Sequence, residues 1–137
     1  MILVLMRMLW TLPTTSVGLL IGGMCTPFGA RWQVREGVLE CYGGLAGWLL
    51  EHATVLEGGA LGITFGDVII GRTAVALDEV RRHEQVHVRQ AHRWGPAFIP
   101  AYLGASLWVW LRGGDSYRGN PFEKEAYGVS ESGGRGR

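Results

Sequence analysis

The chain has 137 residues, of which 13 are Lys or Arg and 12 are Asp or Glu, and its formal net charge is +1. This length fits one domain with a single core. The basic residues are spread along the chain without a dense block, so charge gives no reason to expect a nucleic-acid partner. The two cysteines, Cys25 and Cys41, form no CxxC pair and indicate buried thiols rather than a disulfide scaffold.

Residues 1–28 form an apolar N-terminal segment that is a candidate membrane helix. At about 1.5 Å per residue, the stretch from Met1 to Met24 could just cross a hydrocarbon layer of about 30 Å. A cleaved signal peptide fits less well, because no basic cluster precedes the apolar run and no small-x-small site closes it. The alternative is an amphipathic or buried helix. The sequence therefore leaves the location open between membrane-associated and cytoplasmic.

The next part of the chain has patterns typical of strands. Residues 31–42 alternate between polar and apolar on either side of a turn at Glu36-Gly37, which predicts a β-hairpin. Residues 43–57 have apolar spacing typical of a helix, but their glycines argue against a stable one. Residues 61–70 are rich in β-branched and aromatic side chains, which predicts a strand with a bulge or tight turn at Gly66-Asp67.

The second half of the chain is predicted to be helical. In residues 74–94, side chains spaced three and four residues apart fall on one side of a helix. This side is expected to face the core. Residues 98–111 are apolar all round, which is typical of a helix buried in protein or in lipid. Asn120 followed by Pro121 is typical of a helix start. Residues 130–137 are Ser, Glu, Gly and Arg and predict a disordered tail.

The helix over residues 74–94 contains the sequence HEQVH, in which His83, Glu84 and His87 match the pattern HExxH. Residues four apart project side by side on a helix, so the two imidazoles can bind one ion. A catalytic zinc site takes three protein ligands and a water, and Glu84 can accept a proton from that water. The alternative is a pair of histidines without a metal. Two imidazoles and a carboxylate would, however, be costly to bury unpaired.

The third ligand must come from another part of the chain, and the helix after Asn120 offers Glu123 and Glu125. The order of a Gly-rich strand, an HExxH helix, an apolar helix and a Glu-containing helix resembles the gluzincin class of zinc peptidases. Within that class it is most similar to the membrane-bound prenyl-protease and heat-shock peptidases. The resemblance covers residues 61–127. It implies that Glu123, in the family pattern ExxAD, is the third zinc ligand, with Glu125 as the reserve.

The chain departs from that family at Tyr127, where the peptidases have an Asp that hydrogen-bonds a ligand histidine. Tyr127 brings no negative charge to this position. The resemblance also implies that the strand at residues 63–66 lies over the active site and pairs with an extended substrate. Tyr117, Arg118 and His92 are candidates for stabilising an oxyanion. His92 lies on the outer side of its helix and is expected to contact solvent.

Four arginines share the outer side of the HExxH helix, and they are expected to form a solvated surface: Arg81, Arg82, Arg89 and Arg93. Alternative interpretations are that this side meets anionic lipid headgroups or nucleic acid. In the former case the protein would be a small membrane-associated protein in which the HExxH pattern is incidental.

These patterns predict an α+β fold with a zincin-like domain over residues 29–129. In that domain a small antiparallel sheet packs on the HExxH helix, and apolar helices complete the core or touch a membrane. The apolar segment of residues 1–28 precedes the domain, and the tail of residues 130–137 follows it. The patterns give no oligomeric state.

The expected function is zinc-dependent hydrolysis of a peptide or protein substrate. Zn²⁺ is bound by His83, His87 and Glu123, and Glu84 is the catalytic base. The alternative function is a zinc-binding structural or regulatory protein that performs no catalysis. The short chain and the tyrosine at position 127 favour this alternative.

Overall fold

The computed structural model describes residues 1–54 and 58–134, and for residues 130–134 it describes the backbone alone. The fold is α+β, with one four-stranded sheet in the order β1-β2-β4-β3. The strands are β1 (Arg31–Arg35), β2 (Val38–Tyr42), β3 (Gly62–Phe65) and β4 (Val68–Gly71).

The sheet is mixed, so the expected antiparallel sheet is wrong. Strands β1 and β2 pair antiparallel, as do β3 and β4, but β2 and β4 run parallel. Parallel neighbours need a crossover connection, and helix α2 (Gly44–His52) lies in the connection from β2 to the β3–β4 pair. The sequence patterns were ambiguous here, because the spacing was helical but the glycines argued against a stable helix. The crossover connection was therefore not predicted.

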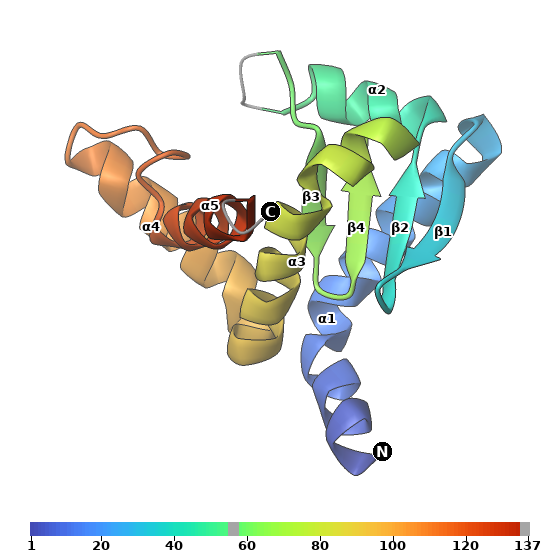
Figure 1. The fold of residues 1–137 in the computed structure, drawn as a ribbon, viewed down its shortest axis with the longest axis horizontal. Coiled ribbons are helices and arrows are strands. Elements are labelled where there is room, and N and C mark those ends of the chain that lie inside the picture. The colour runs from blue at the N-terminus through green and yellow to red at the C-terminus, as the bar shows by residue number, and fades with distance from the viewer. Residues whose placement is uncertain (55–57, 135–137) are drawn as a thin grey trace.

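Helices cover both faces of the sheet (Figure 1). Helix α1 (Ile2–Cys25) lies with α2 on one face, and helix α3 (Ala74–Trp94) lies on the other. Side chains along the central strands alternate between these two layers. Cys41 and Ile70 belong to the core on the side of α1 and α2, whereas Ile69 packs with Leu77 and Val88 of α3. All four residues of β4 are buried, as expected for a strand covered on both faces.

The predicted HExxH helix is confirmed as α3, from Ala74 to Trp94. It begins where the hydroxyl of Thr73 accepts a hydrogen bond from the backbone N–H of Ala76 (3.0 Å). It ends at Gly95, whose φ of 57° suits glycine. Most of the expected inward side is buried, including both histidines of the motif, but Val80 is half-buried and Trp94 is exposed.

Glycines in α2 and at the β3–β4 turn are explained by close packing. A side chain at Gly47 would come within 2.5 Å of the carbonyl oxygen of Arg72, so glycine lets α2 approach the end of β4. Gly66 has a φ of 60°, and a Cβ there would come within 2.4 Å of the hydroxyl of Thr15 in α1. The tight turn expected at Gly66-Asp67 is confirmed, and it joins two strands.

Only part of α1 packs on the sheet. Its buried residues lie at steps of three and four, and they are small or polar: Thr11, Thr14, Gly18, Gly22 and Cys25. Residues 1–10 are exposed and project from the body of the protein (Figure 1). The region Ile2–Phe28 has the length and composition of a membrane span. The free part, however, extends only about 15 Å at 1.5 Å per residue, about half of a hydrocarbon layer.

Two further helices follow α3. Helix α4 (Phe98–Leu111) has the predicted bounds, but among its residues only Phe98 is fully buried by protein. Helix α5 (Pro121–Gly134) begins as expected, because Oδ1 of Asn120 accepts a hydrogen bond from the N–H of Phe122 (2.9 Å). Its backbone continues to Gly134, whereas a disordered tail was expected from residue 130. Residues 135–137 lie outside the described residues.

A buried ion pair joins the sheet to α3. Glu40 of β2 is fully buried, and Arg81 of α3 donates to both of its carboxylate oxygens at 2.9 Å. Gln33 donates a third hydrogen bond to the same carboxylate (2.8 Å). The expectation that Arg81 belongs to a solvated surface is therefore wrong, while its neighbour Arg82 is exposed.

We expect Arg81→Ala to lower the free energy of unfolding by about 3 kcal/mol, because it leaves the Glu40 carboxylate buried and without its cation. Arg82→Ala is the matched control and should change stability by less than about 0.5 kcal/mol. Urea unfolding of the two variants measures the difference. Equal stabilities would show that the ion pair does not hold the sheet to α3.

Candidate metal centre

Three side chains from α3 and α5 meet at one point. His83 and His87 project from successive turns of α3, and Glu123 reaches them from the first turn of α5. Nε2 of His83 lies 2.9 Å from Oε2 of Glu123, and Nε2 of His87 lies 3.1 Å from Oε1. All three residues are buried, and they form a group that could hold a metal ion.

The distances within this group suit a tetrahedral ion. Two donor atoms about 2.0 Å from a tetrahedral zinc ion lie about 3.3 Å apart, and the two histidine Nε2 atoms are 3.3 Å apart. Two histidines and a carboxylate form a ligand set known for catalytic zinc, which leaves a fourth position open. The donor atoms therefore fit zinc in both chemical type and separation.

Gln90 orients one of the two histidines. Nδ1 of His87 donates a hydrogen bond to Oε1 of Gln90 (2.8 Å), which directs the other nitrogen of the ring towards Glu123. The amide of Gln90 is held in turn by the carbonyl of Phe122 (2.9 Å) and by Glu125 (3.2 Å). A hydrogen bond to the outer nitrogen of a ligand histidine commonly fixes its tautomer, and Gln90 supplies it here.

The other histidine lacks such a partner. Nδ1 of His83 is buried and has no hydrogen-bond partner in the described part of the chain. The ring of Tyr127 packs against His83 with a centroid separation of 4.3 Å. Tyr127 thus lies beside the ligand histidine, as its place in the sequence pattern implied, but the contact is through its ring.

Glu84 lies next to this group and is tied to the edge strand β3. The hydroxyl of Thr64 donates to Oε2 of Glu84 (2.6 Å) and also lies 3.2 Å from its backbone carbonyl. Burial raises the pKa of the Glu84 carboxyl, although His87 and the bond from Thr64 act in the opposite direction. A carboxyl with a raised pKa is suited to accept and return a proton near neutral pH.

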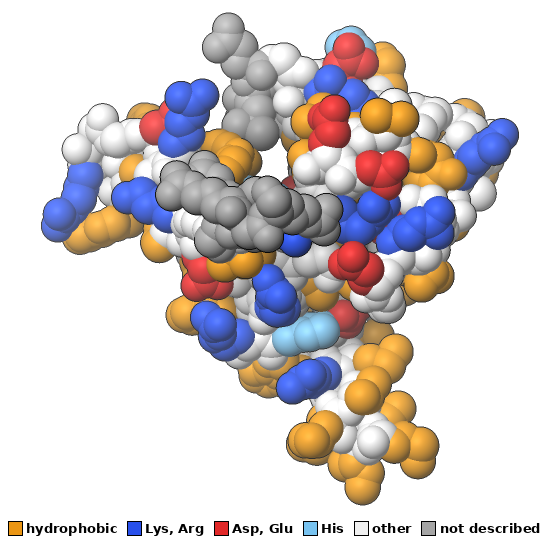
Figure 2. Space-filling view, viewed as in Figure 1, with side chains coloured by type: hydrophobic (Ala, Val, Ile, Leu, Met, Phe, Trp, Pro, Cys, Tyr) orange, Lys and Arg blue, Asp and Glu red, His pale blue; other side chains and the backbone are white. Residues whose placement is uncertain are grey.

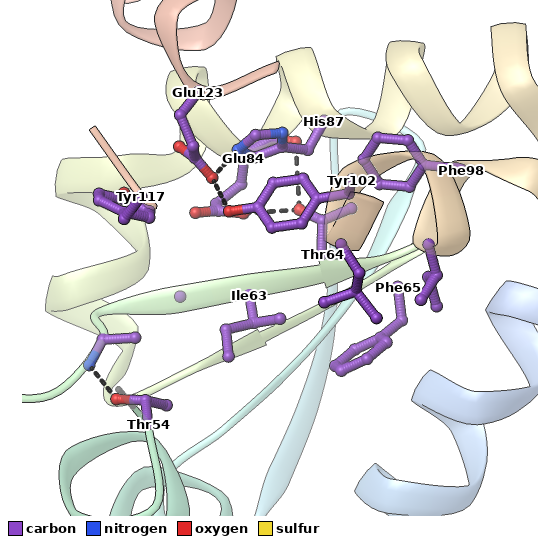
Figure 3. Close-up of a pocket in the computed structure, with 14 residues that line it drawn as sticks. Thr54, Ile63, Thr64, Phe65, Glu84, His87, Phe98, Tyr102, Tyr117 and Glu123 are labelled. Carbon is purple, nitrogen blue, oxygen red and sulfur yellow. Dashed lines mark hydrogen bonds and ion pairs between the residues drawn. The ribbon is translucent and has the colours of Figure 1, made fainter. Parts of the chain in front are cut away.

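A cavity of about 270 Å³ opens beside Glu84, His87 and Glu123 (Figure 3). It lies between β3, α3 and the first part of α4. Tyr102 of α4 lines it and donates a hydrogen bond to Oε1 of Glu123 (2.7 Å). Most of the other lining side chains are apolar: Ile63, Phe65, Phe98, Ile99 and Leu103. The cavity thus joins a charged end at the candidate ligands to an apolar wall.

His87 and Glu123 stabilise each other's charged forms. Burial disfavours the charged form of His87, but hydrogen bonding to Glu123 and the charges of Glu84 and Glu123 outweigh it and raise the pKa of His87 to about 9. Burial likewise disfavours the Glu123 carboxylate, but the bonds from His83 and His87 outweigh it and lower its pKa to about 2. Without a metal, a His87 proton therefore sits where an ion would bind.

Of the other residues predicted for the site, some line the cavity and some lie elsewhere. Tyr117 lines the cavity, and its hydroxyl lies 2.9 Å from that of Tyr127. Neither Arg118 nor His92 is among the described lining residues. His92 is half-buried and pairs with Asp67 in the β3–β4 turn, so it contacts both solvent, as expected, and a partner that was not predicted. Glu125, the reserve ligand, bonds Gln90 and lies outside the ligand group.

Three residues of the site were not found from the sequence: Thr64, Gln90 and Tyr102. Gln90 follows His87 by three residues on the same side of α3, so helical spacing could have indicated it. Thr64 belongs to the strand of residues 63–66 that was expected over the site, but its bond to Glu84 was not predicted. Tyr102 comes from α4 and carries no comparable signal.

Comparisons with models of protein families, with curated proteins and with solved structures found no match to this chain. The assignment of a function therefore depends on the geometry of the site.

We expect the purified protein to bind about one zinc ion per chain, and His87→Ala and Glu123→Ala to lose most of it. Glu125→Ala is the matched control, since this carboxylate is two residues from Glu123 and outside the ligand group. Elemental analysis after dialysis measures the zinc content. Loss of zinc from Glu125→Ala together with retention by Glu123→Ala would reverse the ligand assignment.

We also expect the metal-free protein to lose stability as the pH rises from 6.5 to 9. The folded pKa of His87, about 9, exceeds the ordinary value of 6.5, so its stabilisation is complete below 6.5 and is lost as the pH rises through 9. The raised pKa of Glu84 acts in the same direction. Zinc should stabilise the protein increasingly over this range, because it competes with the His87 proton.

Thermal unfolding with and without zinc measures both trends. The variant His87→Ala should flatten the dependence of the metal-free protein on pH. His52→Ala, which changes an exposed histidine, should leave the dependence unchanged. A melting temperature of the metal-free parent that rises with pH would contradict the assigned pairing of His87 with Glu123.

Proposed function

We propose that this protein is a zinc-dependent metallopeptidase with a zincin-like domain. The proposal depends above all on one observation: His83, His87 and Glu123 bring ligand atoms within 4.8 Å of one another. Glu84, which completes the HExxH pattern, lies beside them at the wall of a cavity. A ligand group, an adjoining carboxyl and a space for a substrate are the components that hydrolysis of a peptide bond requires.

Each residue has a distinct task in this mechanism. A zinc ion bound by His83, His87 and Glu123 would polarise a carbonyl and lower the pKa of a water. Glu84 accepts the proton of the attacking water and then transfers it to the amine that leaves. Thr64 holds the carboxyl of Glu84 through a bond of 2.6 Å, and Gln90 holds the ring of His87.

Strand β3 is suited to bind an extended peptide. It lies at an edge of the sheet, pairs with β4 on one side only, and four of its residues line the cavity. Main-chain groups at a free sheet edge can pair with an added strand. A peptide paired with β3 would pass the carboxyl of Glu84, because Thr64 of β3 is bonded to that carboxyl.

A zinc-binding protein without catalytic activity is the competing proposal. One observation favours it: Nδ1 of His83 is buried without a hydrogen-bond partner among residues 1–54 and 58–134. Loss of such a bond commonly costs tenfold to about a hundredfold in metal affinity or activity. The competing proposal predicts zinc binding by the parent protein and no cleavage of any peptide.

We expect Glu84→Gln to retain zinc and to lose peptide cleavage by at least about a hundredfold, because the amide cannot accept the proton of the attacking water. Glu79→Gln, which changes an exposed glutamate of the same helix, should cleave at the parent rate. A peptide library cleaved by the parent protein and the two variants tests this. Parent-level cleavage by Glu84→Gln would exclude the assigned role of Glu84.

A further inference from the structure

Helix α4 carries a broad exposed apolar surface next to the metal centre, which we call the α4 patch. Its large side chains are between 55% and 66% exposed, and they are Leu103, Leu107, Trp108, Trp110 and Leu111. At 3.6 residues per turn they share an arc of about 160°. The opposite side of α4 is occupied by protein, since Ser106 bonds Asn120 and Val109 lies against Gly114 and Gly119. An apolar surface of this kind marks an interaction site.

The chemistry of the α4 patch fits the surface of an anionic bilayer. No acidic residue occurs from Phe98 to Gly114, and the next one, Asp115, accepts hydrogen bonds from the backbone N–H groups of Tyr117 and Arg118. The guanidinium of Arg112 lies 4.3 Å from the ring centre of Trp108 at the end of the helix, and Arg118 follows in the next loop. Tryptophan and arginine beside an apolar helical surface are typical of helices that lie at a membrane interface, where arginine is attracted to anionic headgroups.

Helix α1 provides a second, independent observation. Residues 1–10 are exposed, and all of them except Arg7 are apolar; in Figure 2 apolar side chains cover this projecting end. A Cβ on Gly95 would lie within 2.0 Å of the Trp10 indole, so α1 meets the chain immediately before α4. The free end of α1 has the length to enter one leaflet, and the α4 patch has the composition to lie on it.

The α4 patch is connected to the candidate metal ligands. Tyr102 lies on α4 one turn before Ser106, and its hydroxyl donates to Glu123 (2.7 Å). The fully buried Asn120 donates to the carbonyl of Tyr102 (3.0 Å) and to the hydroxyl of Ser106 (2.8 Å), and it also caps α5, which carries Glu123. A shift of α4 would therefore also shift Glu123.

We infer that α4 docks on an anionic phospholipid surface and that this docking holds Glu123 in its ligand position, so that lipid and zinc strengthen each other's binding. The inference relies on the metal site of the proposed function. A surface that favours the packed position of α4 also favours the arrangement that binds the ion. Such a coupling is reciprocal, so zinc must tighten lipid binding by the same factor by which lipid tightens zinc binding.

The test measures the zinc affinity of the full chain, by competition with a chromogenic chelator, with and without vesicles that contain anionic phospholipid. We expect the vesicles to tighten zinc binding by about fivefold or more. Cosedimentation should show an equal effect of zinc on vesicle binding. An unchanged zinc affinity would overturn the inference. Equal tightening by uncharged phosphatidylcholine vesicles would overturn the role given to Arg112 and Arg118.

Three variants separate the lipid contact of α4 from its coupling to zinc binding. Leu107→Asp should bind zinc like the parent in solution but gain no affinity from vesicles, even if α1 still binds them. Val34→Asp, the same kind of change at an exposed apolar residue of β1, should behave like the parent. Tyr102→Phe should retain the lipid contact of α4 and lose most of the coupling, because it removes the bond to Glu123.

Other outcomes would assign the α4 patch differently or reject the metal site. If the protein self-associates without vesicles and Leu107→Asp abolishes this, the patch binds a second copy of the chain and the lipid inference is wrong. A parent protein that binds vesicles through Leu107 but binds no zinc would contradict the proposed function. Zinc binding that vesicles do not affect would overturn the inference and leave the proposed function standing.

Discussion

Helix α3 packs on the sheet with one side and carries two of the candidate metal ligands on the adjoining side. One side contributes Leu77 and Val88 to the core, and its Arg81 neutralises the buried carboxylate of Glu40. The adjoining side presents the two histidines to α5. Because a helix is rigid over this length, fixing one side against the sheet also fixes where the imidazoles point. The position of the site therefore depends on the same packing and ion pair that hold the core together.

The candidate ligands are arranged before any ion binds, but the arrangement has a cost. Ionisable groups that are buried lose hydration, which disfavours their charged forms. Glu123 offsets this loss with hydrogen bonds from His83, His87 and Tyr102, and Gln90 supports the outer nitrogen of His87. Among residues 1–54 and 58–134, no group bonds the outer nitrogen of His83. Hydrogen bonds therefore support His83 less completely than the other two candidate ligands.

The apolar surface of the protein is distributed unevenly. The free end of α1 and the outer side of α4 are exposed, whereas strand β4 is buried on both faces. The free end of α1 meets the rest of the chain where Trp10 lies against Gly95, just before α4 begins. Tyr102 of α4 lines the cavity and donates a hydrogen bond to Glu123. A shift of α4 would therefore also shift this candidate ligand.

The sequence by itself determined the features that depend on residues close together in the chain. Helical spacing gave α3 with His83, Glu84 and His87 on its inward side, and the Asn-Pro pair gave the start of α5. The HExxH pattern with its family resemblance selected Glu123, which lies within the ligand group. Only the tertiary structure decided the parallel pairing of β2 with β4, the partners of Arg81 and His92, and the contacts of Thr64 and Tyr102 with the site. These depend on segments far apart in the chain, and no local periodicity records which of them meet.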